Sequence, residues 1–295
     1  MSGLNRETLI RILSALIALP VLAYALITDS FLFIPALIAS IIISLITLYE
    51  YYMISSKDES NRPFVTTGLI AGLILNVIIY FYAFGKFFGA PRAFQNFDAR
   101  IIIGFFTLLI AVLLVQQLLT RPLKGGIYSL AVTLFGIMYI VLSMSHIMLL
   151  KSLKDGSFYI VILIVVVMLN DTGAYFGGVL FGKTKAGFEA SPNKSWEGYF
   201  TGLLFSIIAC ILANQVCVSF FSMELFTLIE CAILGVILSI SANIGDLIES
   251  AIKRDGGFKD SGSIIPGHGG MWDAFDATIF SLPFFYYYLV LKGIA

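Results

Sequence analysis

The sequence predicts an all-α, polytopic integral membrane protein of about nine transmembrane helices. The first observation is composition: the 295 residues are 59% hydrophobic and only 12% charged, and the mean hydropathy is +0.96. The second is segmentation, because a helix needs about 20 apolar residues to cross the hydrocarbon core and the chain holds runs of that length. The candidate spans are approximately 9–28, 31–54, 65–84, 101–119, 127–149, 158–180, 199–220, 225–245 and 274–291.

The third observation is the distribution of charge. With the N-terminus inside, 12 of the 18 Lys and Arg residues fall in cytoplasmic segments and 6 fall outside. The positive-inside rule therefore predicts an N-in, C-out topology. The zero formal net charge excludes a nucleic-acid-binding protein, whose domains carry a basic surface. Cys210, Cys217 and Cys231 lie in apolar spans without metal-ligand spacing, which predicts packing roles.

The chain divides by chemistry into an N-terminal membrane region, 1–157, with about five spans, and a catalytic region, 158–295, with about four. The first region contains isolated polar residues and little that suggests chemistry. Glu50 lies near a helix end and is expected at the membrane interface. His146 stands alone near the outer end of its span and is expected to have a packing role.

The stretch from Asn243 to Asp276 is unusually polar for this chain. Taken as a helix, its first part places Asp246, Glu249, Ser250 and Lys253 on one face and apolar residues on the other. A glycine-rich middle follows, of a kind that lets backbone amides approach a phosphate. Asp273 and Asp276 are spaced i, i+3 at the start of the last span, where a divalent cation would relieve their repulsion.

A second polar segment interrupts the sixth span and continues into the loop after it. Asp171 is costly at membrane depth and is expected to face protein or a wet cavity. Gly173 and Gly177 also form a small-xxx-small pair, so this stretch can serve helix packing on another face. In the loop, Lys194 supplies a point charge for phosphate, and Glu197 falls where the seventh helix should begin.

The predicted topology brings these segments to one membrane face. Five acids converge there: Asp171, Glu197, Asp246, Asp273 and Asp276. The bases that accompany them include Lys194, Lys253, Arg254, Lys259 and His268. Such a mixture suits Mg²⁺-dependent handling of a polyphosphate, since acids bind the metal while bases neutralise phosphate oxygens. The ordinary alternative is a solvated loop whose basic residues only set topology.

At these residues the sequence resembles the phosphatidate cytidylyltransferase family, also called CDP-diacylglycerol synthases. The family's C-terminal signature is matched by Ser250, Lys253-Arg254, Lys259-Asp260, His268-Gly269-Gly270, Asp273 and Asp276. The segments D-T-G-A-Y-F, F-G-K and S-P-N-K-S-W-E-G are similar to a second family region, and together the matches cover about residues 170 to 280. Ala274 departs from the pattern, because the family has an Arg between the last two acids.

The resemblance implies transfer of CMP from CTP to phosphatidic acid, giving CDP-diacylglycerol and pyrophosphate. It implies Asp246, Asp273 and Asp276 as Mg²⁺ ligands, with K⁺ as a further family expectation. It assigns Lys194, Lys253, Arg254 and Lys259 to phosphates, and His268 to a phosphate contact, a proton relay or only a loop hydrogen bond. The residues expected to bind substrate are Asp171, Ser191, Asn193, Glu197, Ser250, Gly269 and Gly270.

The resemblance also implies a homodimer in the inner, cytoplasmic membrane, with the active site facing the cytoplasm. Trp196 and Trp272 lie in the two motif regions, and membrane-interface anchoring is favoured over stacking on cytosine. A CTP-dependent lipid kinase, or a cytidylyltransferase for another lipid phosphate, would use the same groups. A cation transporter is the remote alternative, and it would need polar residues continuing toward the outer side.

Overall fold

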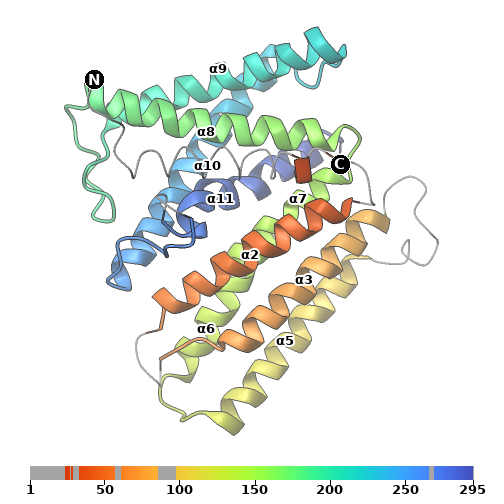
Figure 1. The fold of residues 1–295 in the computed structure, drawn as a ribbon, viewed down its shortest axis with the longest axis vertical. Coiled ribbons are helices and arrows are strands. Elements are labelled where there is room, and N and C mark those ends of the chain that lie inside the picture. The colour runs from red at the N-terminus through yellow and green to blue at the C-terminus, as the bar shows by residue number, and fades with distance from the viewer. Residues whose placement is uncertain are drawn as a thin grey trace. The chain divides into compact units, whose positions relative to one another are not determined.

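The computed structural model describes residues 24–26, 28, 33–56, 61–85, 98–265 and 269–294, and the long elements among them are all helices (Figure 1). Eight helices in these ranges are long and apolar enough to cross a membrane. The predicted fold class is therefore confirmed. The first predicted span, 9–28, lies almost wholly outside the described residues, so the count of nine and the N-in, C-out topology stay predictions.

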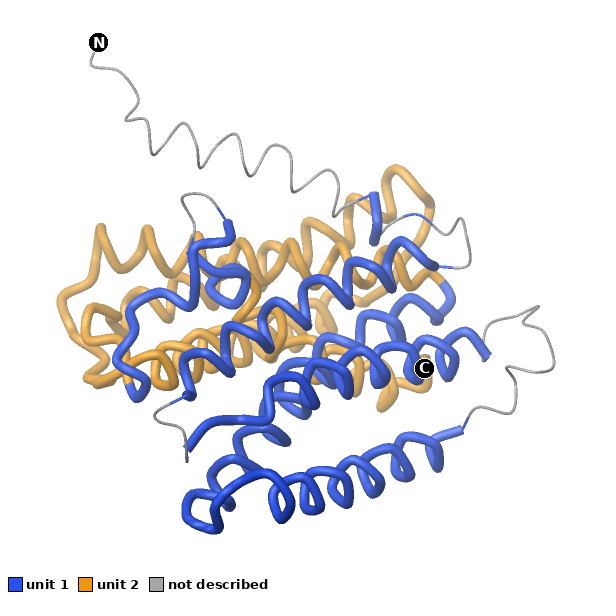
Figure 2. Tube along the Cα trace, turned by 60° about the horizontal axis from the view of Figure 1, so that its bottom comes forward, with its two compact units in different colours: residues 1–154, 255–274 blue, residues 155–254, 275–295 orange. Residues whose placement is uncertain are grey.

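The chain forms two compact units, coloured separately in Figure 2. The first unit contains residues 1–154 and 255–274, and the second contains residues 155–254 and 275–295. The last segment of the first unit carries much of the predicted C-terminal signature. The predicted division between residues 157 and 158, into a membrane region and a catalytic region, rests on where the polar motifs lie in the sequence. It stays a prediction.

The first unit is built on apolar helices joined by buried polar contacts. Its helices are α2 (Ile34–Ile54), α3 (Val65–Gly85), α5 (Ala99–Thr120), α6 (Gly126–Gly136), the π-helical segment η2 (Ile137–Leu142) and α7 (Ser143–Lys151). Asn76 of α3 accepts a hydrogen bond from Ser40 at 2.8 Å and donates to Ser44 at 3.0 Å, which joins α3 to α2. His146 is buried with Nδ1 2.8 Å from the Leu142 carbonyl oxygen, as its predicted packing role requires.

The second unit contains α8 (Gly156–Phe181), α9 (Trp196–Phe221), α10 (Leu228–Asp255, to Arg254 in this unit) and α11 (Met271–Leu291, from Phe275 onward). Helices α8 and α9 run side by side in Figure 1. Their close approach depends on glycine, since Gly173 faces the Phe205 side chain and Gly177 faces Thr201. The predicted small-residue packing face is confirmed.

Helix α10 is longer than its apolar span. The apolar pattern ends near residue 245, but the helix continues to Asp255. The polar residues that follow keep helical spacing, and Glu249 and Lys253 form an i, i+4 ion pair at 2.8 Å. The apolar span and the polar helix predicted after it are thus one element.

A glycine contact between α9 and α10 gives a stability prediction. A Cβ atom at Gly235 would lie 2.6 Å from the Ile207 Cα, and a backbone atom cannot move aside cheaply. Gly235→Val should therefore lower the free energy of unfolding by about 1–3 kcal/mol or more. Thermal denaturation in detergent measures this, with Gly104→Val as control because nothing lies within 4 Å of the Cβ position there. An equal loss in both variants would contradict the packing argument.

Candidate active site

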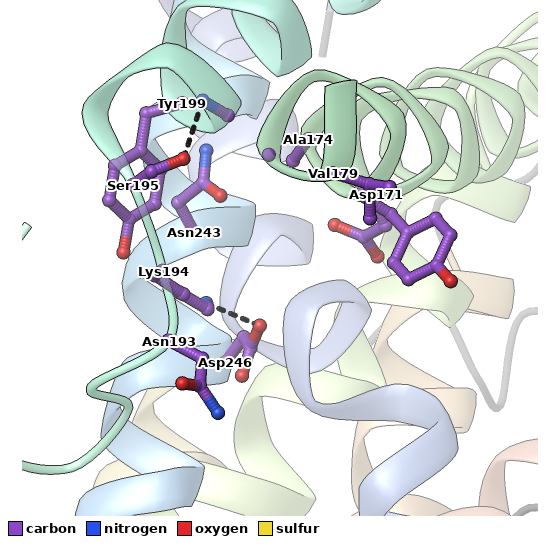
Figure 3. Close-up of a pocket in the computed structure, with 12 residues that line it drawn as sticks. Asp171, Ala174, Val179, Asn193, Lys194, Ser195, Tyr199, Asn243 and Asp246 are labelled. Carbon is purple, nitrogen blue, oxygen red and sulfur yellow. Dashed lines mark hydrogen bonds and ion pairs between the residues drawn. The ribbon is translucent and has the colours of Figure 1, made fainter. Parts of the chain in front are cut away.

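The second unit contains a cavity of about 380 Å³, shown in Figure 3, at the cytidylyltransferase-like motif residues of α8, α9 and α10. Its lining residues are Asp171, Ala174, Tyr175, Gly178, Val179, Asn193, Lys194, Ser195, Gly198, Tyr199, Asn243 and Asp246. The cavity therefore brings together three predicted site residues that carry charge, Asp171, Lys194 and Asp246, from three separate segments.

The loop before α9 is held in a defined shape by local hydrogen bonds. Ser195 is the N-cap of α9, and its Oγ accepts from the Gly198 amide at 3.2 Å. The Lys194 carbonyl accepts from the Ala186 amide at 2.9 Å, within a short antiparallel bridge between Lys185 and Ser195. Lys194 is thereby fixed one residue before the helix cap.

Lys194 and Asp246 form the central ion pair of the cavity. The Lys194 Nζ lies 2.5 Å from the Asp246 Oδ2, as the dashed line in Figure 3 marks. The two side chains are 22% and 37% exposed, so solvent screens the pair only in part. Ser250 lies one turn further along α10, with its Oγ 3.4 Å from Asp246 Oδ1.

Asp246 also belongs to a group of three carboxylates that could hold a metal ion. One ligand oxygen each from Asp246, Glu249 and Asp276 lies within 4.8 Å of the others. Gly245 allows α10 and α11 to approach here, because a Cβ atom would lie 2.8 Å from the Asp276 carbonyl oxygen. Clustered carboxylate oxygens are the donors that Mg²⁺ prefers, so the residues fit that ion.

Glu249 is a member of this group that the sequence did not single out as a ligand. It was visible only as part of the polar face of a helix, spaced i+3 from Asp246. Its carboxylate is buried and lies 2.8 Å from the Lys253 Nζ. Lys253, predicted to contact phosphate, is thus placed beside the carboxylate group.

Asp171 lies on the cavity wall contributed by α8, as Figure 3 shows. Its Oδ1 accepts a hydrogen bond from Asn170 Nδ2 at 3.1 Å. The Asn170 Oδ1 in turn accepts from Ser239 Oγ of α10 at 2.7 Å. A buried amide therefore joins α8 to α10 and orients the acid at the same time.

Two further residues of the cavity were not predicted. Asn243 donates from Nδ2 to the Ser239 carbonyl at 2.8 Å. The Tyr199 hydroxyl is buried and has no hydrogen-bond partner among the described residues, while its ring lies 5.7 Å from the Lys194 Nζ. Buried hydroxyls are nearly always paired, so Tyr199 is suited to a ligand contact. Its place directly after the S-P-N-K-S-W-E-G segment was the available sequence signal.

Other predicted residues shape the loop before α9, and among them Glu197 and Ser191 do not line the cavity. Glu197 accepts from the Thr184 amide at 3.1 Å through both carboxylate oxygens. The Ser191 carbonyl accepts from the Lys194 amide at 3.3 Å, in a turn that leads to that lysine. Asn193 does line the cavity, and its carbonyl accepts from Lys185 Nζ at 3.2 Å. Trp196 is half-exposed, beside Tyr199.

The remaining signature residues belong to the first unit, except Arg254. The Asp273 Oδ2 accepts from the Ser261 amide at 2.9 Å, the Ser261 Oγ at 2.9 Å and the Gly270 amide at 2.7 Å. Gly269 has a φ of 98°, a left-handed conformation that favours glycine. Arg254 and Lys259 are exposed, the former at the end of α10 in the second unit. His268 lies outside the described residues.

Two predictions about aromatic and acidic residues were wrong. Trp272 is fully buried and packs against Tyr51 and Tyr139, with ring centroids 5.5 and 6.5 Å away, so it is not an interface anchor. Glu50 is 3% exposed and accepts backbone hydrogen bonds from Met271 and Trp272, so it is not interfacial. In both cases the partner is distant in sequence, and a local pattern cannot reveal it.

Comparison with known proteins agrees with these motifs. Residues 9–292 match the model of a family described as the cytidylyltransferase family. The chain is 33% identical over 274 residues to a phosphatidate cytidylyltransferase from Staphylococcus saprophyticus, covering 93% of this chain and 96% of that protein. A protein of the same name from Mycobacterium bovis is 34% identical over 199 residues, 65% of this chain and 62% of the relative. Another, from Bacillus subtilis, is 40% identical over 139 residues, 46% of this chain and 49% of the relative.

Proposed function

This chain belongs to the cytidylyltransferase family, and we propose that it transfers CMP from CTP to phosphatidic acid, giving CDP-diacylglycerol and pyrophosphate. The observation that carries the proposal is the cavity in which Lys194 pairs with Asp246 beside two further carboxylates. That arrangement offers a cation for a phosphate and a set of oxygens for a divalent metal. The same name on relatives that align with most of the chain supports the choice of lipid acceptor.

Different residues would help to bring the two polyanions, CTP and phosphatidic acid, together. The phosphate of phosphatidic acid is already anionic, so attack on the α-phosphate of CTP needs little help from a base. Asp246, Glu249 and Asp276 would hold Mg²⁺, which screens phosphate charge and stabilises the departing pyrophosphate when bound. Lys194 would neutralise phosphate oxygens at the cavity wall, and Lys253 balances the charge of Glu249.

The resemblance assigns Asp273 to a metal ion as well, and we propose that role for it. Its Oδ2 accepts three hydrogen bonds, from Ser261 and Gly270, and such partners orient a ligating carboxylate. Arg254, Lys259 and His268 are proposed phosphate contacts on the resemblance alone. A nearby K⁺ ion, a homodimer and an inner-membrane enzyme with a cytoplasmic active site are proposed on the same basis.

The cavity wall on α8 supports a lipid substrate. Tyr175 and Val179 line the cavity and are 67% and 65% exposed. Both lie on a helix long and apolar enough to cross the membrane. A cavity that joins a charged pair to an apolar helix face can accept a phosphate together with the acyl chains attached to it.

The direct test uses the purified full-length protein in detergent with Mg²⁺, phosphatidic acid and CTP labelled on the α-phosphate. Label in the organic phase with an equal release of pyrophosphate is the expected result. Absence of lipid label would overturn the proposal. Transfer of label from γ-labelled CTP to lipid, with CDP release, would identify a lipid kinase.

The missing family Arg gives a further prediction. Ala274 is exposed, so an arginine side chain has room there. Ala274→Arg should fold normally and keep or raise the rate of CMP transfer, because a guanidinium adds a phosphate partner. Steady-state kinetics with labelled CTP checks this, and Ala274→Gln controls for side-chain length. A large loss in the Arg variant alone would show that the chain has adapted to a small neutral residue there.

A further inference from the structure

Glu50 of α2 holds the start of α11 through a buried carboxylate. Its Oε1 accepts from the Met271 amide at 2.9 Å, and its Oε2 accepts from the Trp272 amide at 2.8 Å. The Ser261 Oγ lies 3.2 Å from the same Oε2. These residues all belong to the first unit, although 211 to 222 positions separate Glu50 from its partners.

The contacts satisfy a helix end that has no cap of its own. The first amides of a helix lack partners within it, and a negative charge near them is favourable. Gly270, the residue before α11, has no side chain to accept from them, so Glu50 accepts from the first two amides and Ser261 Oγ from the Asp273 amide at 3.3 Å. Asp273 in turn accepts from the Gly270 amide at 2.7 Å, which completes a capping box drawn from three segments.

The packing around this cap leaves little freedom. A Cβ atom at Gly270 would lie 2.7 Å from both Glu50 carboxylate oxygens, so the glycine lets the acid reach the helix end. Trp272 is fully buried against Tyr51, the neighbour of Glu50. The Ser261 hydroxyl has one proton and lies between two carboxylates, 2.9 Å from Asp273 and 3.2 Å from Glu50. A shift of the Glu50 carboxylate would therefore change the hydrogen bond between Ser261 and Asp273.

We propose that Glu50 is a positioning residue for the reaction: it fixes the start of α11 and, through Ser261, the orientation of the Asp273 carboxylate. This inference rests on the proposed cytidylyl transfer for its kinetic consequence. Only an acceptor with two oxygens can serve both amides and the hydroxyl. In Glu50→Gln, the amide nitrogen would face an N–H donor, and the negative charge at the helix end would be lost.

The kinetic test compares Glu50→Gln with Ser40→Ala. Ser40 is buried on the same helix and loses one hydrogen bond, to Asn76, without contacting the cap. We expect kcat to fall about 10- to 100-fold in Glu50→Gln, the usual effect of removing a partner that orients a ligand. The KM values for CTP and phosphatidic acid should change much less, because Glu50 does not line the cavity. Glu50→Asp, which keeps both oxygens, should recover part of the rate.

A spectroscopic test separates this inference from the proposed function. Trp196→Phe leaves Trp272 as the single tryptophan, since the chain has two. In that background Glu50→Gln should shift Trp272 emission to the red and increase acrylamide quenching, whereas Ser40→Ala should do neither. If the parent lacks cytidylyl transfer, only the proposed function fails, and the emission still decides whether Glu50 holds the helix start.

Emission and kcat that match the parent in Glu50→Gln would overturn the inference. An equal loss of kcat in Ser40→Ala would also overturn it, because the effect would then reflect general stability. If Glu50→Gln cannot be recovered folded, Glu50→Asp is judged by the same two measurements.

Discussion

Replacing Asp246 by Asn is expected to lower kcat for CMP transfer by about 100-fold or more. Asp246 is the residue at which the ion pair and the carboxylate group meet, since it pairs with Lys194 at 2.5 Å and also lies with Glu249 and Asp276. The Asn variant loses one of three negative charges from the metal group and leaves Lys194 without its carboxylate. The Mg²⁺ concentration for half-maximal rate should rise as well.

Glu230→Gln is the matched control. Glu230 also lies on α10 and forms an ion pair at 2.5 Å, with Lys292, but it does not line the cavity. It should keep the parent rate and the parent Mg²⁺ dependence. Isothermal titration with Mg²⁺ gives a readout independent of turnover, in which only the Asp246 variant should bind more weakly. Full activity in Asp246→Asn would remove the proposed metal site.

Replacing Lys194 by Met is expected to raise the KM for CTP and to lower kcat, with kcat/KM reduced by at least about 100-fold. Among the residues that the structure describes, Lys194 is the cationic side chain that lines the cavity. Met keeps much of the length of lysine while removing the charge. The ammonium and a bound metal ion would compete for the Asp246 carboxylate. The Mg²⁺ requirement should therefore fall in this variant, whereas it should rise in Asp246→Asn.

The control for this change is Lys292→Met, which breaks the other α10 ion pair and should leave kcat/KM near the parent value. The opposite directions of the two Mg²⁺ effects are the informative outcome. A raised Mg²⁺ requirement in Lys194→Met would mean that the lysine only holds Asp246 in place. The phosphate role proposed for it would then be wrong.

The helices could be predicted from the sequence because the thickness of the bilayer sets the length of an apolar run that crosses it. The predicted 65–84 and 158–180 spans correspond to α3 and α8 within two residues at each end. The sequence did not predict that the apolar and polar parts of α10 form one helix. Hydropathy falls after residue 245, while the helix continues to Asp255. The π-helical segment Ile137–Leu142 was not predicted either, since no proline or polar break marks it.

Three charged residues of the candidate site were predictable, because each is a polar position in or beside an apolar run. Asp171, Lys194 and Asp246 all line the cavity. The i, i+3 spacing of Asp273 and Asp276 predicted a shared metal pair, whereas the carboxylate group found in the second unit includes Glu249 with Asp246 and Asp276. Helix spacing predicts which side chains share a face of one helix. It does not predict which neighbouring helix packs against that face, because that depends on the tertiary structure.

The role of Glu50 could not be inferred from its surroundings in sequence. An acid at the end of an apolar run is usually solvated, and nothing nearby identifies its partners. Those partners are backbone amides of Met271 and Trp272, and backbone donors leave no trace in a residue pattern. Only folding brings the acid and the helix end together.

The unbroken length of α10 fixes how far its acids lie from the start of the helix. Its 28 residues make a rod of about 42 Å at 1.5 Å per residue, against a hydrocarbon core of about 30 Å. Asp246 and Glu249 lie in the final third of this rod and move with it, because no hinge separates them from the membrane span. The 18 residues of α10 that precede Asp246 therefore fix the distance between these acids and the start of the helix at about 27 Å.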